Sequence, residues 1–522
     1  DGYLLGIDVG TSGTKTAVFA FDGALVAAAT AEYPLSQPQP GWAEQDPEDW
    51  WQAVATGVRT ALSLARERAG VEPGDVAGLG LSGQMHGAVL LDHQFQVIRP
   101  AIIWCDQRST EQCHRIDDRL GRDKVIALTG NPALPNFTAT KVLWVRDHEP
   151  ENYARIGHVL LPKDYIRWRL TGELATEVSD ASGTLFLDVA GRRWSAEMLA
   201  GLDIPREWLP SVHESPVITG LVSRAAAEAT GLPQGLPVVG GGGDQAAGAV
   251  GNGIVEEGIV SSTIGTSGVV FAFTPEIKAD PEGRLHSFCH AVPGKWHVMG
   301  VTQAAGGSLQ WFRNHLGQAE VEVARLARRD PYELLAEEAA TVPPGADGLV
   351  FLPYLMGERT PHLDSQAKGV FFGLTSRHTK AHLVRAVMEG VAFSLRDCLS
   401  LIEDLGIRVD AVRLSGGGAR SPLWRQIQAD VFGKEVSLVS SVEGPAFGVA
   451  LLAGVGTGVY PSVEAACRAT IRRVDEAQPD PAARPRYQQA YALYRRLYPA
   501  LRDLFGEAER DSLGTSRLGG VC

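Results

Sequence analysis

A run of four glycines followed by a carboxylate is the segment of this sequence best suited to chemistry. The run is Val238-Val239-Gly240-Gly241-Gly242-Gly243-Asp244, near the middle of the chain. Glycine adopts backbone angles that other residues avoid, and it lets a ligand approach the backbone closely. We therefore expect a strand that ends in a tight turn, with Asp244 at the start of a helix. There its carboxylate could accept a proton from a bound substrate.

Two other interpretations of this segment stay open. The residues from Gly241 to Ala246 fit the dinucleotide-binding pattern G-x-G-x-x-A. Against that pattern, a carboxylate inside the turn would repel a pyrophosphate. The acidic residue expected about 20 positions further on is also missing, since Ile264 stands there. The plainer interpretation is a glycine-rich turn whose Asp caps a helix.

A second chemical feature is a repeated tetrapeptide. Gly10-Thr11-Ser12-Gly13 recurs as Gly265-Thr266-Ser267-Gly268, and each copy lies between two β-rich segments. Successive amides in such a turn form a nest for an anion, and the hydroxyl groups add donors. The repeat indicates an internal duplication, in which two hairpins could hold a polyphosphate from both sides.

Further polar or glycine-rich turns follow expected strands. Gly83-Gln84-Met85-His86-Gly87 follows an apolar strand, Trp104-Cys105-Asp106 ends a short one, and Gly416-Gly417-Gly418-Ala419-Arg420 follows a third. Ligands of open α/β sheets bind beyond the carboxyl ends of the strands. These turns are therefore candidates for the walls of a binding site.

The elements that must position these turns can be predicted from periodicity and capping signals. The chain opens with a three-stranded meander over residues 3–33, followed by a helix from Asp46 to about Gly70. Helices are also expected over 304–315, 319–340 and 382–402. The uncharged segment 444–460 predicts a buried helix followed by a turn, and not a membrane span.

Composition and charge bound the function. At 522 residues the chain should form two large domains, and 44% hydrophobic and 21% charged residues are usual for a globular protein. The net charge is -13 and no block of basic residues occurs, so neither nucleic acid nor an anionic membrane is an expected partner. The six scattered cysteines and the absence of a signal peptide at the start of this sequence predict a cytoplasmic protein with reduced thiols. The cluster His286-Ser287-Phe288-Cys289-His290 is not expected to bind zinc, because no second pair at ligand spacing accompanies it.

The motifs together resemble those of the FGGY carbohydrate kinases. The resemblance covers about residues 3–500 and is carried by five segments besides the glycine-rich turns. They are Asp8-Val9-Gly10-Thr11-Ser12, Gly83-Gln84-Met85-His86-Gly87, Trp42-Ala43-Glu44-Gln45-Asp46-Pro47, Leu161-Pro162-Lys163-Asp164-Tyr165 and Gly369-Val370-Phe371-Phe372-Gly373-Leu374. One signature, around Thr138, Lys141 and Trp144, departs from the family because it begins with Asn136 in place of Gly, Met or an aromatic residue. Within the family, the closest resemblance is to kinases that act on D-xylulose.

This resemblance implies a fold and its domains. We expect an α/β fold with two actin-like (ribonuclease H-like) domains around a central cleft. The N-terminal domain, residues 1–253, would bind the sugar and carry an insertion at about 109–203. The C-terminal domain, residues 254–508, would bind the nucleotide, and residues 509–522 would form a disordered tail.

The resemblance also implies a reaction and its residues. The expected reaction is ATP-dependent phosphorylation of D-xylulose to D-xylulose 5-phosphate, with Asp244 as general base and Asp8 organising Mg2+ through water. The expected sugar contacts are Met85, His86, Trp104, Asp106 and Gln245. The expected ATP contacts are Gly10, Thr11, Ser12, Gly265, Thr266, Gly416, Gly417 and Ala419. Kinases for ribulose, glycerol, gluconate or fuculose stay open as alternatives, as do a non-catalytic sugar sensor and a homodimer.

Overall fold

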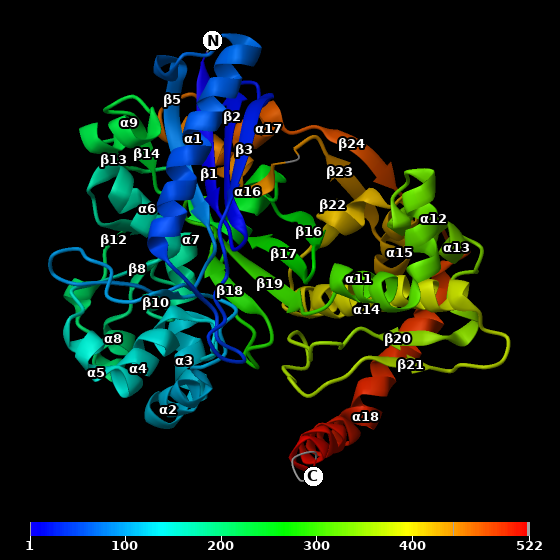
Figure 1. Cartoon of the computed structure of the whole chain (residues 1–522). Coiled ribbons are helices and arrows are strands. Elements are labelled where there is room, and N and C mark those ends of the chain that lie inside the picture. Colours follow the sequence, from blue (N-terminus) through cyan, green and yellow to red (C-terminus); the bar gives the residue numbers. More distant parts are fainter. Residues whose placement is uncertain (1, 442, 519–522) are drawn as a thin grey trace. The chain divides into compact units, whose positions relative to one another are not determined.

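The computed structural model describes residues 2–441 and 443–518, and Figure 1 labels its helices and strands. The contacts between residues divide the chain into two compact units. The first unit comprises Asp1–Glu256, Phe273–Val298 and Ser440–Arg472, and the second comprises Glu257–Ala272, Met299–Val439 and Arg473–Cys522. The domain boundaries expected after residues 253 and 508 stay predictions.

The first unit is built on a mixed sheet with the strand order β13-β14-β5-β1-β2-β3. β1, β2 and β3 form the expected antiparallel meander, and β5 runs parallel to β1 on its other side. β14 runs parallel to β5, and β13 pairs antiparallel with β14 at the edge. The strands are β1 (Tyr3–Val9), β2 (Gly13–Ala20), β3 (Leu25–Glu32), β5 (Val76–Gly83), β13 (Ile218–Leu221) and β14 (Pro237–Val239).

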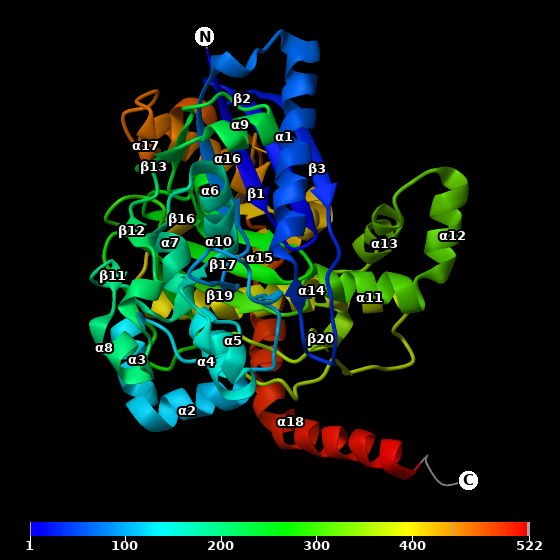
Figure 2. The ribbon, with the colours of Figure 1, turned by 60° about the vertical axis from the view of Figure 1, so that its left-hand side comes forward.

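One face of this sheet is covered by α1 (Pro47–Ala69), which packs on β2 and β3 (Figure 2). The helix begins as expected, because the Asp46 side chain accepts a hydrogen bond from the amide of Glu48 at 2.9 Å. Pro47 fits the first helical position, since the N–H group that proline lacks would have no partner within the helix there. It ends at Gly70, whose φ of +67° closes the last turn. Apolar residues of α1 and of β1 are fully buried between helix and sheet, which makes this layer the core of the unit.

The other face contacts α16 (Gly444–Gly456), which is buried over most of its length. A Cβ atom at Gly6 of β1 would lie 1.9 Å from the Ala446 carbonyl oxygen, and one at Gly80 of β5 would lie 2.0 Å from that of Val449. The sheet backbone therefore touches the helix backbone directly. The expectation of a buried helix in segment 444–460 is confirmed.

The remaining elements of the first unit are short and include those of the expected insertion. They are β4 (Glu44–Gln45), β6 (Val89–Leu91), β7 (Ala101–Ile102), α2 (Thr110–Leu120), α3 (Arg122–Thr129), α4 (Thr138–His148), α5 (Pro150–Ala154), β8 (His158–Leu160), α6 (Pro162–Thr171), β9 (Ala175–Glu177), α7 (Val178–Ala181), β10 (Leu187–Asp188), β11 (Arg193–Trp194), α8 (Ala196–Leu202), β12 (Ser211–His213), α9 (Arg224–Thr230), β15 (Gly242–Gly243), α10 (Asp244–Gly251), β18 (His286–Cys289) and α17 (Val463–Thr470).

The second unit repeats the strand arrangement of the first. β16 pairs antiparallel with β17 and parallel with β22, as β1 does with β2 and β5. The sheet continues in the order β19-β17-β16-β22-β23-β24. The strands are β16 (Gly258–Ile264), β17 (Gly268–Thr274), β19 (Trp296–Thr302), β22 (Val409–Ser415), β23 (Glu435–Val439) and β24 (Arg473–Ala477), with β20 (Val350–Leu352) and β21 (Val370–Phe372) in a separate pair. Because both tetrapeptides join the first two strands of such a meander, the expected hairpin at each of them is confirmed.

The helices of the second unit correct one expectation. The predicted helix over 319–340 is two helices, because Asp330 caps a new helix at the Tyr332 amide, Pro331 starts it, and Arg328 has a φ of +54°. These two helices pack with each other and with the helix before them (Figure 2). The helices are α11 (Gly306–Leu316), α12 (Gln318–Ala327), α13 (Pro331–Ala340), α14 (Lys380–Asp404), α15 (Pro422–Phe432) and α18 (Arg484–Leu518).

The C-terminal residues are only partly described. α18 extends to Leu518, and residues 519–522 lie outside the described part of the chain. The expectation of a disordered tail therefore stays a prediction. No helix among the described residues combines the length and the apolar character that a membrane crossing needs.

We expect the turn before Asp244 to tolerate no side chain at Gly241. Gly241 has a φ of +74°, and a Cβ atom there would lie 1.8 Å from the Leu81 carbonyl oxygen. Gly172 is the matched control, because its φ is +76° but nothing lies within 4 Å of its Cβ position. Gly172→Ala should lose about 1–2 kcal/mol through backbone strain alone, and Gly241→Ala should lose clearly more. Thermal unfolding of both variants measures this difference, and equal melting temperatures would contradict it.

Candidate active site

The glycine-rich turn forms the strand-turn-helix junction expected from the sequence. β14 ends at Val239, Gly242 and Gly243 pair with the end of β5, and α10 begins at Asp244. The amide of Gly241 donates to the Ser215 carbonyl oxygen at 2.9 Å. Asp244 therefore lies in the first turn of a helix, where backbone amides favour its ionised form.

Asp8 lies close to this turn because both flank the same residue of β5. Asp8 pairs with Ser82 from one side and Gly242 pairs with Ser82 from the other. The backbones of Asp8 and Gly242 are therefore separated by two strand spacings, about 10 Å. The sheet register brings together two carboxylates that are more than two hundred positions apart in sequence.

Both carboxyl groups bind a proton more tightly than usual at this partly buried site. Burial raises the pKa of Asp244 to about 7, and the negative charge of Asp8 adds to the effect. Burial also raises the pKa of Asp8 to about 6, although the Ser82 hydroxyl and the charge of Lys15 act in the opposite direction. A pKa near neutrality suits a general base.

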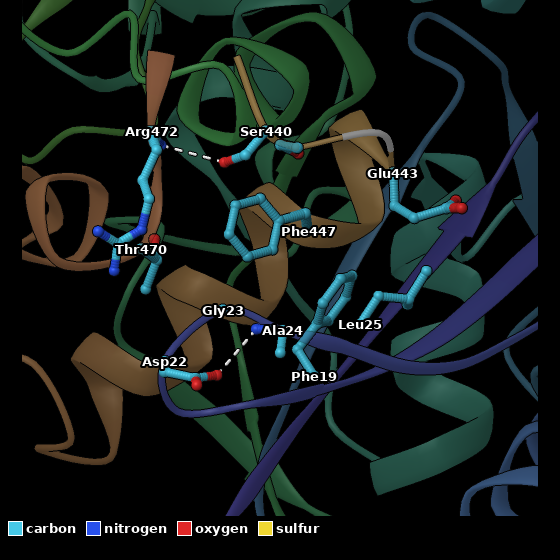
Figure 3. A pocket seen from close by; sticks show the side chains of 11 residues that line it. Phe19, Asp22, Gly23, Ala24, Leu25, Ser440, Glu443, Phe447, Thr470 and Arg472 are labelled. Carbon is cyan, nitrogen blue, oxygen red and sulfur yellow. Dashed lines mark hydrogen bonds between the residues drawn. The ribbon is translucent and has the colours of Figure 1, made fainter. Parts of the chain in front are cut away.

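Lys15, the cation nearest to Asp8 in the sheet register, is itself paired. It lies opposite Asp8 across β1 and β2, and its Nζ atom lies 2.7 Å from a carboxylate oxygen of Glu443. Figure 3 shows Glu443 beside a pocket of about 330 Å³ that Phe19 and Phe447 also line. Lys15 therefore offsets the charge of Asp8 only in part.

Asp8 fits a role in holding a divalent cation. Its Oδ1 atom is buried and has no hydrogen-bond partner within the described residues. Mg2+ prefers oxygen ligands and keeps several waters. A buried carboxylate oxygen without a protein partner can contribute to holding such an ion, whose other ligands would be water and phosphate oxygens.

The hairpin at Gly10 to Gly13 has its carbonyl groups bonded to the protein. The Gly10 oxygen accepts from the Tyr33 hydroxyl at 2.5 Å, the Thr11 oxygen from Gln45 Nε2 at 2.7 Å and the Ser12 oxygen from the Tyr33 amide at 3.2 Å. Oxygen atoms that are satisfied in this way do not turn toward a bound anion. The loop is therefore suited to present amides and hydroxyls to phosphate.

Tyr33 and Gln45 were not predicted as functional residues. Gln45 is also bound by Trp50 Nε1 at 3.0 Å and by Gln84 Nε2 at 2.9 Å. Gln84 in turn donates to the Gly10 oxygen at 3.3 Å. The place of Gln45 in the Trp42–Pro47 motif could have marked it as functional, but no pattern in the sequence indicated which residues it contacts.

Met85 and His86 lie beside the turn that carries Asp244. A Cβ atom at Gly243 would lie 2.9 Å from Met85 Cγ. His86 has a φ of +73°, and its Nδ1 atom is 2.7 Å from the Gly183 carbonyl oxygen. Both side chains are buried, so the loop after β5 is held rigidly next to the candidate base.

The other expected sugar contacts differ in their surroundings. Trp104 is 39% exposed, and its indole donates to Thr11 Oγ1 at 2.8 Å. Gln245 follows Asp244 on α10 and is partly exposed. Asp106 is fully buried, and its carboxylate accepts from the Ala43 amide at 2.6 Å and pairs with Arg108 at 2.8 Å. These bonds give Asp106 a structural role, and its direct contact with a sugar stays an untested prediction.

In the second unit, the hairpin at Gly265 and Thr266 also has its carbonyl groups satisfied. The amide of Gly306 donates to the Gly265 oxygen at 2.8 Å, and those of Ala305 and Gly307 donate to the Thr266 oxygen at 2.9 and 3.0 Å. Amides at the start of α11 thus bind the carbonyl oxygens of this hairpin, whereas two side chains bind carbonyl oxygens of the first hairpin.

A pocket of about 1060 Å³ extends from this hairpin through the second unit. Gly265, Thr266 and Gly417 line it, together with apolar side chains of α11, α13 and α15. Its charged lining residues are of both signs: Arg313, Arg329, Asp330, Glu333, Glu337 and Arg420. Gly416 and Ala419 belong to the same turn as Gly417, and the φ of Gly416 is +79°. The residues expected to bind nucleotide in this unit therefore lie at or next to one large pocket.

Comparison with known proteins identifies relatives over nearly the whole chain. Residues 3–251 match the N-terminal domain of the FGGY family of carbohydrate kinases, and residues 260–457 match its C-terminal domain. The xylulose kinase of Escherichia coli (strain K12) is 43% identical over 501 residues, which are 95% of this chain and 99% of that protein. The gluconokinase of Bacillus subtilis (strain 168) is 32% identical over 465 residues, 89% of each chain. Among solved structures, the xylulose kinase from Rhodospirillum rubrum gives a TM-score of 0.87 at 33% identity and covers 97% of this chain and 100% of that one.

The raised pKa of Asp244 predicts that its charge destabilises the folded protein. Because its pKa rises from 3.8 to about 7 on folding, the folded state binds the proton more tightly and stability falls as pH rises between these values. Asp244→Asn should therefore melt about 2–4 °C above the wild type at pH 8, and the gain should vanish near pH 4. Asp118→Asn, at an exposed position of α2, controls for the loss of one charge. A lower melting temperature of Asp244→Asn at pH 8 would contradict the burial of this charge.

Proposed function

This chain belongs to the FGGY family of carbohydrate kinases, and from that premise we propose that it transfers the γ-phosphate of ATP to D-xylulose. The products would be ADP and D-xylulose 5-phosphate. The observation that carries the mechanism is the pairing of Asp8 and Gly242 with the same residue of β5, which sets Asp244 beside a second carboxylate and near the Gly10–Gly13 hairpin. The choice of sugar rests on the similarity to the xylulose kinase of Escherichia coli.

In this proposal Asp244 is the general base. Its carboxylate accepts the proton of the C5 hydroxyl group as that oxygen bonds to the γ-phosphorus, and the bond to the bridging oxygen of ADP breaks. The pKa of about 7 supports this role, because a base whose pKa lies near the working pH is both ionised and strong enough to accept a proton. General-base help of this kind contributes roughly 10²- to 10⁴-fold to the rate.

The phosphate groups would be held mainly by backbone amides. Gly10, Thr11 and Ser12 are the proposed contacts in the first unit, and Gly265 and Thr266 those in the second. The satisfied carbonyl groups of both hairpins support this proposal. Gly416, Gly417 and Ala419 would contact the adenosine, which the large pocket beside them can accommodate.

A divalent cation would be bound near Asp8, whose unpaired Oδ1 atom supports the assignment. A Mg2+ ion bound through water would neutralise charge on the phosphate oxygens, which is the main requirement of phosphoryl transfer. Asp8 itself would orient the water ligands. Asp8 and Asp244 together argue against a sugar sensor without catalytic activity, because such a protein needs neither group.

Met85, His86, Trp104, Asp106 and Gln245 are the proposed sugar contacts. The buried loop that contains Met85 and His86 offers a rigid wall next to Asp244. Gluconate is the second candidate substrate, because the gluconokinase of Bacillus subtilis is 32% identical over 89% of this chain. A homodimer, a cytoplasmic location and the domain boundaries at residues 253 and 508 stay predictions.

A coupled assay for ADP release tests the reaction and the base together. With Mg2+ and ATP, D-xylulose should stimulate ADP release with a kcat/KM at least about tenfold above that of gluconate, ribulose, glycerol or fuculose. Asp244→Asn should lower kcat by roughly 10²- to 10⁴-fold, while calorimetry finds ATP binding nearly intact. Asp118→Asn serves again as the matched loss of one charge.

Two outcomes would count against the proposal in different ways. Wild-type turnover by Asp244→Asn would remove the assigned base. A preference for gluconate over D-xylulose with Asp244 still required would keep the base and overturn the sugar.

A further inference from the structure

A cluster of five charged side chains is buried behind the turn that carries Asp244. Lys163, Asp164 and Arg167 come from α6, Glu177 is the last residue of β9, and Asp180 lies in α7. All five side chains are fully buried. Lys163 Nζ lies 3.0 Å from Asp164, 3.1 Å from Glu177 and 2.7 Å from Asp180. The proposed reaction uses none of these groups.

Stability alone does not account for such a cluster. Removing charges from water costs several kcal/mol for each ion, and apolar residues of the same volume are often as stable or more so. Three carboxyl groups face two cations here, and burial raises the pKa of Asp180 well above its usual range. The contacts that the cluster makes with the backbone suggest what it does instead.

Arg167 holds the end of the strand that leads into the turn. Its guanidinium group donates to the Val239 carbonyl oxygen at 2.7 Å and to the Gly240 oxygen at 2.5 Å. It also donates to Thr219 Oγ1 at 2.7 Å. The planar fork of arginine can bind two successive carbonyl groups at once, which a lysine cannot do.

Ser179 holds the other end of the turn. The amide of Gly243, the residue before Asp244, donates to Ser179 Oγ at 3.1 Å. Ser179 is placed by Glu177, whose carboxylate accepts from the Ser179 amide at 2.6 Å and from the Asp180 amide at 3.0 Å. Lys163 in turn pairs with Glu177. The cluster therefore connects α6 to both ends of the turn.

The turn between these two anchors is bonded along its length. The Gly240 amide donates to the Val217 oxygen at 2.8 Å and the Gly241 amide to the Ser215 oxygen at 2.9 Å. With Arg167 on the carbonyl side and Ser179 on the amide of Gly243, the peptide planes leading to Asp244 are held in one orientation. A misplacement of about 1 Å in a reacting group can cost roughly 10²-fold in rate.

We propose that Arg167 and Ser179, held in place by the buried Lys163–Glu177 ion pair, are positioning residues that set the orientation of the Asp244 carboxylate toward the sugar hydroxyl. This inference rests on the proposed role of Asp244 as general base. Neither residue contacts substrate in this account. Both act through the backbone of the turn.

Ser179→Ala is the sharpest test, because it removes one hydroxyl group and leaves the buried charges in place. It should lower kcat about tenfold while KM for D-xylulose and for ATP stays within about twofold. Ser182→Ala is the matched control, since Ser182 is equally buried three residues later but accepts from the Cys289 amide at 3.0 Å, not from the turn. Ser182→Ala should keep a kcat close to that of the wild type. Ser179→Thr, which retains a hydroxyl group, should recover most of the lost kcat.

Two further variants show whether the effect acts through Asp244. In the Asp244→Asn background, Ser179→Ala should cause no additional loss of kcat, because the group that it positions is already absent. Arg167→Lys keeps the buried charge but loses the fork, and it should also lower kcat more than it changes either KM. Circular dichroism and thermal unfolding establish that each variant is folded.

The outcomes separate this inference from the proposed function. A wild-type kcat in Ser179→Ala, or an equal loss in Ser182→Ala, would overturn the positioning role while leaving Asp244 as the base. A full additional loss of kcat in the Asp244→Asn background would also overturn it. Wild-type turnover by Asp244→Asn alone would instead reject the proposed function.

Discussion

The close approach of the Gly241 backbone to the Leu81 carbonyl group is the constraint on which the candidate site depends. No side chain fits there, since a Cβ atom would lie 1.8 Å from that oxygen. The contact lets Gly242 and Gly243 join the end of β5, where Ser82 has Gly242 on one side and Asp8 on the other. Two carboxylates far apart in sequence thus become neighbours through the register of one strand. Loss of contact with water raises both pKa values, to about 7 for Asp244 and about 6 for Asp8, which suits a site that binds a cation and accepts a proton.

The hairpins at Gly10–Gly13 and Gly265–Gly268 both have their carbonyl oxygens bonded within the protein, but different groups bind these oxygens. A loop that is to bind phosphate must keep its carbonyl oxygens away from the anion. In the first unit the side chains of Tyr33 and Gln45 bind two of those oxygens and the Tyr33 amide binds a third, whereas in the second unit the amides at the start of α11 bind them. The strand arrangement around the hairpins is the same in both units, so the loop and its strands are alike while the groups behind the loop differ. Side-chain anchors can be tuned by single substitutions, whereas backbone anchors depend on the glycines at 306 and 307.

Local patterns in the sequence predicted most of the elements and the family. The glycine-rich turn before Asp244, the capped start of α1 and both hairpins depend on residues that are neighbours in the chain, so they could be predicted. The break between α12 and α13 was missed although Asp330-Pro331 is a helix-start signal, because the apolar spacing continues across it. Tyr33, Gln45, Arg167 and Ser179 could not be assigned a role, since their partners lie up to 73 positions away and only the folded chain brings them together. The hydrogen bond and ion pair of Asp106 with Ala43 and Arg108 could not be predicted either, and its contact with a sugar, expected from the family resemblance, stays a prediction.

The proposed mechanism depends above all on one proton transfer, from the alcohol that is phosphorylated to the Asp244 carboxylate. A crystal structure of the protein with Mg2+, a non-hydrolysable ATP analogue and D-xylulose measures the relevant distance directly. We expect one carboxylate oxygen of Asp244 within about 3 Å of the C5 hydroxyl oxygen, with that hydroxyl in line with the γ-phosphorus. A well-ordered sugar in which every hydroxyl group lies beyond hydrogen-bonding reach of Asp244 would contradict it.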